Sequence, residues 1–139
     1  MTTSEMAVET EIPELLFASG LPGFPDARRF VLVRLGDETS PFSTLRSIDG
    51  DTDLEFVVTH PGLFFPDYEP EIDDETVARL DLGSADDALL LVIVTVAKPI
   101  EASTANLLGP IVVNRHTRTA AQAVLSNSGY ATREALVRP

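Results

Sequence analysis

The sequence predicts an all-β fold: a compact antiparallel β-barrel or sandwich in a single domain, with one short helix. Short stretches in which apolar and polar residues alternate recur along the chain, as in strands that turn one face to a core. Turn-forming residues separate these stretches at intervals of roughly 8 to 15 residues, a spacing typical of sandwiches and barrels. The chain has 139 residues, of which 44% are hydrophobic, so it is long enough for one domain with its own core.

The strands can be placed along the chain from this pattern. We expect them at residues 6–12, 15–17, 30–35, 42–48, 54–59, 88–96, 105–108, 111–114 and 119–125. The second of these is short enough to be a turn, and helix propensity also favours a helix for the last. Residues 88–96 form a continuous apolar run rich in β-branched side chains, which predicts a strand buried on both faces.

At residues 73–82 the apolar residues change from the alternating spacing of strands to the spacing of a helix. We predict this segment to be the one helix. An Asp at the start can cap it, acidic residues follow in the first turn, and Val77, Leu80 and Leu82 form an apolar stripe before Gly83. We assign residues 1–130 to the β domain. Residues 131–139 are expected to be a flexible C-terminal tail, either disordered or a frayed helix.

The stretch from residue 54 to residue 72 joins a predicted strand to an unusual loop. Pro61 and Gly62 end the strand, and the segment that follows contains Phe64, Phe65 and Tyr68 between prolines before it becomes acidic. Two adjacent phenylalanines are uncommon in a solvated loop. They either plug the end of a core or offer a partner an apolar anchor with an acidic rim.

Charge is abundant and unevenly distributed. The formal net charge is −12, from 22 acidic and 10 basic side chains, which argues against direct binding to nucleic acid and favours a basic protein partner. Residues 67–87 hold nine acidic residues and one basic residue, Arg79. A solvated helix face explains any one of these acids, but together they can steer a basic protein over a Debye length of about 8 Å.

Composition and the N-terminal residues indicate a cytoplasmic protein. The chain has no cysteine, which excludes disulfides and thiolate metal sites and is compatible with a reducing compartment. Its first residues lack the basic and apolar regions of a secretory signal. The longest apolar run, residues 88–97, is too short to cross a bilayer, so we expect no membrane association.

No motif points to catalysis. The two histidines, His60 and His116, lie in no nucleophile motif, and their spacing matches no common zinc motif. The carboxylates are too numerous for any pair to be diagnostic, and the glycine loop at residues 20–23 lacks the continuation of a phosphate-binding loop. We therefore expect no enzyme activity, no metal and no cofactor.

Three segments in order resemble the FliW family of flagellar assembly factors. They are SGLPGFPDARRFVL at residues 19–32, THPGLFFPDYE at residues 59–69 and TANLLGPIVVN at residues 104–114. The similarity extends over roughly residues 9–130. The chain departs from the family at His60, where Asn or Asp is more frequent, and at Gly109, where Ala is more frequent.

The resemblance implies a protein antagonist that works by partner exchange. FliW-like proteins bind flagellin and also CsrA, a small dimeric RNA-binding protein that represses flagellin translation. By position, the resemblance points to Phe64, Phe65, Asp67, Tyr68, Glu69, Glu71, Asn106 and Asn114 as partner-binding residues. Because the two phenylalanines are adjacent, at least one must point into the core, and the two asparagines can instead satisfy local backbone groups.

Three other functions remain open from the residues alone. A small-ligand-binding barrel or carrier would have an apolar interior and a polar mouth around His60. A flagellin chaperone without a CsrA role would use the same fold. A fixed structural subunit would carry a large apolar homodimer face.

Overall fold

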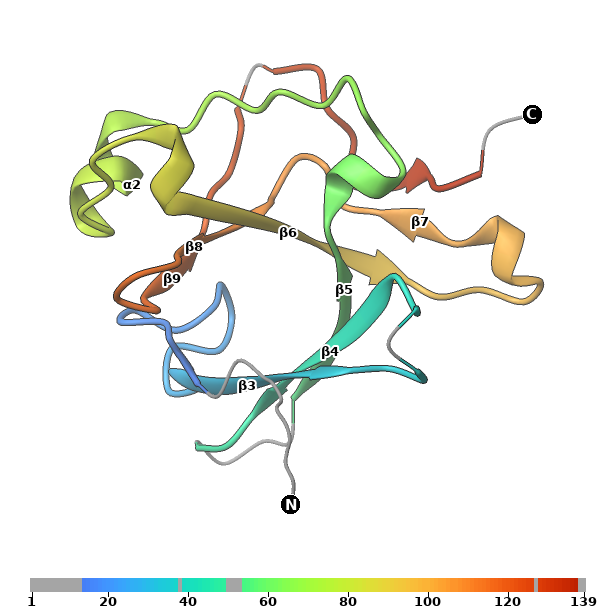
Figure 1. Cartoon of the computed structure of the whole chain (residues 1–139), viewed down its shortest axis with the longest axis horizontal. Helices are drawn as coiled ribbons and strands as arrows, with labels where there is room; N and C mark the ends of the chain where they lie inside the picture. The colour runs from blue at the N-terminus through green and yellow to red at the C-terminus, as the bar shows by residue number, and fades with distance from the viewer. Residues whose placement is uncertain (1–13, 38, 50–53, 127, 138–139) are drawn as a thin grey trace.

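The computed structural model describes residues 14–37, 39–49, 54–126 and 128–137 (Figure 1). The strand expected at residues 6–12 lies outside this part of the chain. The predicted all-β fold is confirmed: antiparallel strands form one connected sheet that curls into a barrel, with one short α-helix in the described residues. The strands are β2 (Leu15–Leu16), β3 (Arg29–Arg34), β4 (Phe42–Ser47), β5 (Glu55–Thr59), β6 (Ala88–Thr95), β7 (Thr104–Ala105), β8 (Ile111–Asn114), β9 (Ala120–Gln122) and β10 (Glu134–Ala135).

The sheet closes on itself through β6. One path runs from β2 through β3, β4 and β5 to β6, and a second runs from β6 through β8 to β9. A single parallel bridge between Leu16 and Thr119 joins the two free ends, with the Leu16 N–H donating to the Arg118 carbonyl at 3.0 Å. A short branch, β7 and then β10, continues from the far half of β6.

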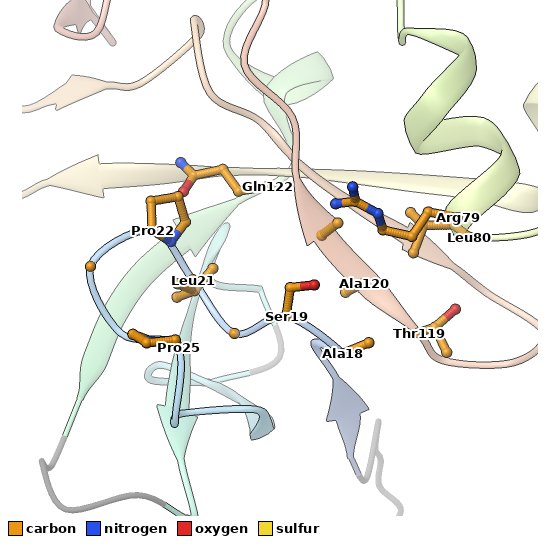
Figure 2. Close-up of a pocket in the computed structure, with 13 residues that line it drawn as sticks. Ala18, Ser19, Leu21, Pro22, Pro25, Arg79, Leu80, Thr119, Ala120 and Gln122 are labelled. Carbon is orange, nitrogen blue, oxygen red and sulfur yellow. The ribbon is translucent and has the colours of Figure 1, made fainter.

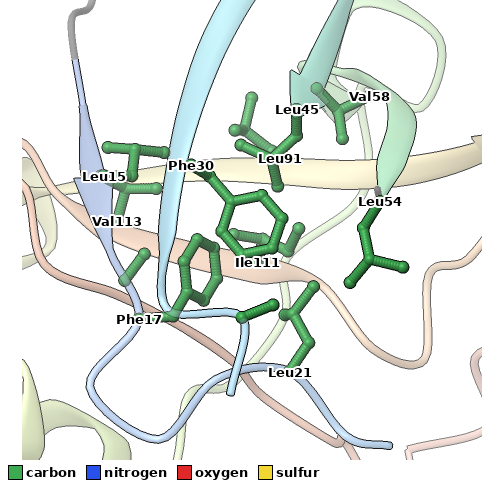
Figure 3. Close-up of a cluster of buried hydrophobic side chains, with 12 residues drawn as sticks. Leu15, Phe17, Leu21, Phe30, Leu45, Leu54, Val58, Leu91, Ile111 and Val113 are labelled. Carbon is green, nitrogen blue, oxygen red and sulfur yellow. The ribbon is translucent and has the colours of Figure 1, made fainter. Parts of the chain in front are cut away.

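Side chains fill the inside of this ring (Figure 3). The main core consists of Leu15, Phe17, Leu21, Ala27, Phe30, Leu45, Leu54, Val58, Leu91, Ile111, Val113 and Ala120. Phe17 and Phe30 meet edge to face, with ring centroids 5.1 Å apart. Alternate residues of β3, β4, β5, β6 and β8 supply this core because successive side chains of a strand point to opposite faces.

The prediction that residues 88–96 are buried on both faces is confirmed for the middle of β6. Leu91 belongs to the main core, whereas Val92 and Val94 belong to a second cluster outside the ring. We call that second group the outer cluster; it consists of Val92, Val94, Phe65, Ala105, Leu107 and Leu136. Leu90 packs on a third group, the helix cluster, built on Leu80, Val112 and Ala123.

The helix α2 (Asp74–Arg79) is shorter than the predicted segment. Asp73 caps it as expected, accepting hydrogen bonds from the backbone N–H and the hydroxyl of Thr76. The helix ends at Arg79 with Leu80 as its C-cap, and Asp81 then takes a positive φ of 56°, so the chain turns before Gly83 is reached. Leu80 is buried against the barrel and fixes the helix there.

The chain differs from the expectations at two further places. Of the predicted strand at residues 105–108, only Ala105 belongs to a strand, β7. The N–H groups of Leu107 and Leu108 donate to the Ala131 carbonyl instead of a strand ladder, and Gly109 and Pro110 then interrupt the backbone before β8. Residues 131–139 were expected to hold a frayed helix or disorder, yet they contain β10, which pairs with β7, and the buried Leu136. Burial of one leucine in the outer cluster fixes this short strand, which no local pattern reveals. Helices in the described residues are all too short to span a bilayer.

Candidate partner-binding surface

The loop after β5 borders an open groove on the outside of the barrel. We call it the aromatic groove; its volume is about 390 Å³. It is lined by Phe64, Phe65, Pro66, Asp67, Tyr68, Leu107, Tyr130 and Glu134. Four of these eight residues were predicted to bind a partner, so the structure brings the central part of that set together.

The two phenylalanines take different positions, as their adjacency requires. A 3₁₀ turn, η1 (Pro61–Leu63), follows β5, and the N–H of Phe65 donates to the Pro61 carbonyl at 2.7 Å. This turn directs Phe65 into the outer cluster, where it is 3% exposed. Phe64 is half-buried and stacks on Phe42, with ring centroids 5.8 Å apart. Phe65 therefore anchors the loop, and Phe64 keeps part of its ring accessible.

Tyr68 ties this loop to two distant segments. Its hydroxyl donates to the Leu107 carbonyl at 2.6 Å, and its ring meets Tyr130 edge to face at 4.8 Å. The N–H of Glu69 donates to the Tyr130 hydroxyl at 3.4 Å. Burial, and to a smaller extent the neighbouring Tyr130, raises the pKa of Tyr68 well above that of an ordinary tyrosine, so its phenol stays protonated.

The predicted acidic residues of the loop lie at the surface. Asp67 is exposed on the wall of the aromatic groove, and Glu69 and Glu71 are exposed beyond it. In the sequence, the half-buried Tyr68 lies between Asp67 and Glu69. The loop therefore presents negative charge around an apolar hollow, which is the arrangement expected of a surface that receives a basic partner.

The two predicted asparagines have local hydrogen bonds. Asn106 is half-buried, and its side-chain oxygen accepts from the Gly109 N–H at 2.9 Å. Asn114 is buried at the end of β8 and makes four hydrogen bonds across its own turn and to the end of α2. Both positions match the alternative in which these side chains satisfy the backbone. Phe65 supports the aromatic groove from inside, whereas Asn114 lies outside the groove lining and holds the end of α2. Partner binding by the exposed residues stays a prediction.

Four residues of the aromatic groove were not among the predicted partner-binding residues. Pro66 and Leu107 were given no role in binding, Tyr130 was placed at the end of the β domain, and Glu134 was placed in the tail. Of these residues, only Tyr130 could have been noticed in the sequence, because it is an aromatic residue beside a predicted flexible tail. The contact between Tyr68 and Tyr130 spans 62 positions of the chain, so no local pattern could reveal it.

A second hollow lies at the seam of the barrel (Figure 2). Its volume is about 380 Å³, and it lies between the loop of residues 18–25, the end of α2 and β9. Figure 2 shows the Arg79 side chain extending from α2 toward this hollow, with Gln122 on its far side. The Gln122 amide donates to the Gly109 carbonyl at 2.8 Å and is held in place. We call this hollow the seam groove.

The histidines lie apart from any catalytic constellation in the described residues. His116 is exposed, and its Nε2 lies 3.0 Å from Asp87 Oδ1. That contact, together with backbone N–H groups of residues 83 and 84, lowers the pKa of Asp87. No group of three or more His, Cys, Asp or Glu side chains that could hold a metal occurs in the part of the chain described. The filled ring also gives the ligand-barrel alternative no support.

The fold and its surface define a small β-barrel protein whose accessible features are grooves and charge on the outside of a filled core. Comparison with known proteins identifies the family. The FliW protein family model matches residues 2–136. The chain belongs to the FliW family, whose curated members compared here are flagellar assembly factors.

Individual relatives are similar over most of the chain. The flagellar assembly factor FliW of Bacillus licheniformis is 42% identical over 129 residues, covering 91% of this chain and 89% of the relative. The FliW of Bacillus subtilis is 43% identical over 119 residues, covering 86% of this chain and 82% of the relative. A crystal structure of the flagellar assembly factor FliW matches with a TM-score of 0.84 and 38% identity, covering 91% of this chain and 87% of the other. All three of these relatives are named as flagellar assembly factors.

Proposed function

We propose that this protein acts in the cytoplasm by binding two proteins in turn, flagellin and the translational regulator CsrA. Binding to CsrA takes the regulator away from its RNA and relieves repression of flagellin translation. Rising free flagellin then occupies the assembly factor and releases CsrA. The observation that carries the proposal is the aromatic groove beside an acidic loop on a FliW-family barrel, an arrangement that supports contact with a protein partner.

Electrostatics supports the antagonism of an RNA-binding protein. The net charge of −12 gives the molecule a negative field that attracts basic protein surfaces and repels phosphates. A bound body of this charge beside an RNA site raises the free energy of placing RNA there. Antagonism of CsrA should therefore weaken as salt concentration rises, because salt screens the field.

The aromatic groove supplies a contact for either partner, and its exposed residues can be changed without disturbing the fold. Asp67 and Glu69 have side chains exposed to solvent, so Asp67→Asn with Glu69→Gln removes two charges at constant shape. Asp26→Asn with Glu101→Gln is the matched control, since both residues are exposed and lie away from the groove. Loss of affinity in the first pair alone would support a contact at this loop.

The test is calorimetric titration of the purified protein with a CsrA dimer and, separately, with flagellin from the same genome. Tight binding to both, with flagellin displacing CsrA, would support partner exchange. Heat with flagellin alone would leave a flagellin chaperone without a CsrA role. Absence of heat with both partners would refute the proposed function.

A further inference from the structure

A third groove lies beside α2, at the other end of the acidic segment. We call it the helix groove; its volume is about 390 Å³. It is lined by Pro70, Ile72, Val77, Leu82, Gly83, Ser84, Ala85, Ala88 and Leu90. Eight of these nine residues have no polar atom in the side chain, so the hollow is apolar. It shares no lining residue with the aromatic groove or the seam groove.

The helix groove exists because the helix cluster is only partly covered. Leu80 and Val112 are buried beneath it, but Ile72, Leu82 and Leu90 pack on them and stay only partly buried. Removing such aliphatic surface from water is favourable by roughly 25 cal/mol per Å². Binding of a partner that covers these side chains is therefore favoured by the burial of their apolar surface.

The wall of the groove is held in place before any partner arrives. Asp87 Oδ2 accepts hydrogen bonds from the N–H groups of Gly83 and Ser84, each at 3.0 Å. The N–H of Arg115 donates to the Asp87 carbonyl at 3.0 Å, which joins this turn to the end of β8. A preformed wall lowers the conformational entropy lost on binding.

The rim of the groove is anionic. Glu71, Asp74, Asp81 and Asp86 are all exposed, and each lies within a few residues of a lining residue. The Arg115 guanidinium, which donates to the carbonyl of the lining residue Ala88 at 3.3 Å, adds one positive charge at the edge of the groove, and the four acids outnumber it. The one base among residues 67–87 is Arg79. Its guanidinium lies 3.1 Å from Glu75 and extends toward the seam groove (Figure 2), which shares no lining residue with the helix groove.

We propose that the helix groove docks a cationic segment of CsrA in which an aliphatic side chain is flanked by Lys or Arg. The aliphatic side chain would enter the apolar hollow, and the flanking cations would lie over the acidic rim. The identity of the partner rests on the proposed function, because an RNA-binding protein carries basic surface. The position and chemistry of the contact rest on the groove itself, which lies outside the set of residues that the sequence predicted.

The test is calorimetric titration of the CsrA dimer into wild-type protein and two matched variants. Ala85→Arg places a bulky cation at an exposed lining position, and Ala102→Arg makes the same change at an exposed position in η3 (Ile100–Ala102). Ala85 lies just before the start of β6, and Ala102 follows the end of that strand. We expect Ala85→Arg to weaken binding by at least about tenfold and Ala102→Arg to change it by less than about twofold.

The rim is tested by its salt dependence. Titrations at about 0.1 M and about 1 M salt change the Debye length from roughly 10 Å to roughly 3 Å. Glu71→Gln with Asp86→Asn should reduce the loss of affinity between these two conditions. The exposed control pair Asp26→Asn with Glu101→Gln should keep the wild-type salt dependence.

The outcomes separate the two proposals. If wild-type protein binds CsrA and Ala85→Arg binds equally well, the helix groove is not the docking site, while the proposed function survives. If the rim pair and the control pair lose affinity equally between low and high salt, the docked segment is not held by its cations. That result would overturn the proposed cationic segment and leave the proposed function intact. If wild-type protein shows no heat with CsrA, the proposed function fails and the docking site fails with it.

Discussion

Asn114 offers a direct test of whether a predicted contact residue is a structural support. Its Nδ2 donates to the carbonyls of Leu80 at 2.8 Å and Asp81 at 3.3 Å. Its Oδ1 accepts from the N–H groups of His116 at 2.9 Å and Thr117 at 3.1 Å. One buried side chain thus joins the end of α2 to the turn after β8, and Asn114→Ala would remove all four bonds.

The expected loss of stability depends on the backbone groups that Asn114→Ala would leave without a hydrogen-bond partner. The bond to the Leu80 carbonyl is buried, and an unsatisfied buried acceptor costs roughly 1–3 kcal/mol. The other three partner groups lie nearer to solvent, so water can replace part of each bond. We expect Asn114→Ala to lower the free energy of unfolding by about 3 kcal/mol in total, a large share of the typical 5–15 kcal/mol.

The assay is urea denaturation followed by far-UV circular dichroism, because the chain contains no tryptophan. For Asn114→Ala, the urea concentration at the midpoint of unfolding should fall. The m-value should stay constant, since the surface exposed on unfolding is unchanged. Asn106→Ala is the matched control, because that side chain makes one recorded side-chain bond and should cost only about 1 kcal/mol. A stability of Asn114→Ala within about 0.5 kcal/mol of wild type would refute the reasoning. Lost CsrA affinity at unchanged stability would instead make Asn114 a contact residue.

Three further changes have expected outcomes. Tyr68→Phe removes a 2.6 Å hydrogen bond and should cost about 1 kcal/mol. Because the folded pKa of Tyr68 is raised, wild-type stability should fall as the pH rises above about 10, and denaturation of the Phe variant should show less of this fall. Asp73→Ala should cost about 1 kcal/mol at neutral pH. The hydrogen bonds to Thr76 lower the pKa of Asp73, so its contribution is present above an unfolded pKa of about 3.9, and the difference from wild type should vanish as acid protonates the cap. Gly20→Ala should prevent folding or lower the melting temperature strongly, because its Cβ would lie 2.5 Å from the Phe24 carbonyl oxygen, whereas Gly23→Ala adds strain from a positive φ but meets no atom within 4 Å.

The strands were predictable because each carries its own pattern. Alternation identified β4 and β5, and runs of apolar, β-branched residues identified β3 and β6, since these signals depend only on neighbouring residues. The helix was predictable from its cap, but its end depends on where Leu80 reaches the barrel. Contacts between distant segments were not predictable: the bridge that closes the barrel and the strand β10 each involve only one or two residues.

The candidate site was predictable in part for the same reason. The acidic loop and its phenylalanines form one short segment, so the sequence located them together. Which phenylalanine is buried depends on the turn at Pro61, and the wall formed by Tyr130 and Glu134 depends on how the end of the chain returns to the barrel. The helix groove escaped prediction because its apolar residues come from α2, two loops and β6, none of which is unusual alone.

The place of β6 has a consequence for how this domain unfolds. Leu90, Leu91 and Val92, three consecutive residues, pack into the helix cluster, the main core and the outer cluster. No cluster can therefore separate from the barrel while the other two keep this strand in register. Amide protons of β6 should exchange with solvent only through global unfolding, as in the most protected segments of small domains. Every folded molecule then displays the aromatic groove and the helix groove together, and a cell cannot lose one surface to local melting while it keeps the other.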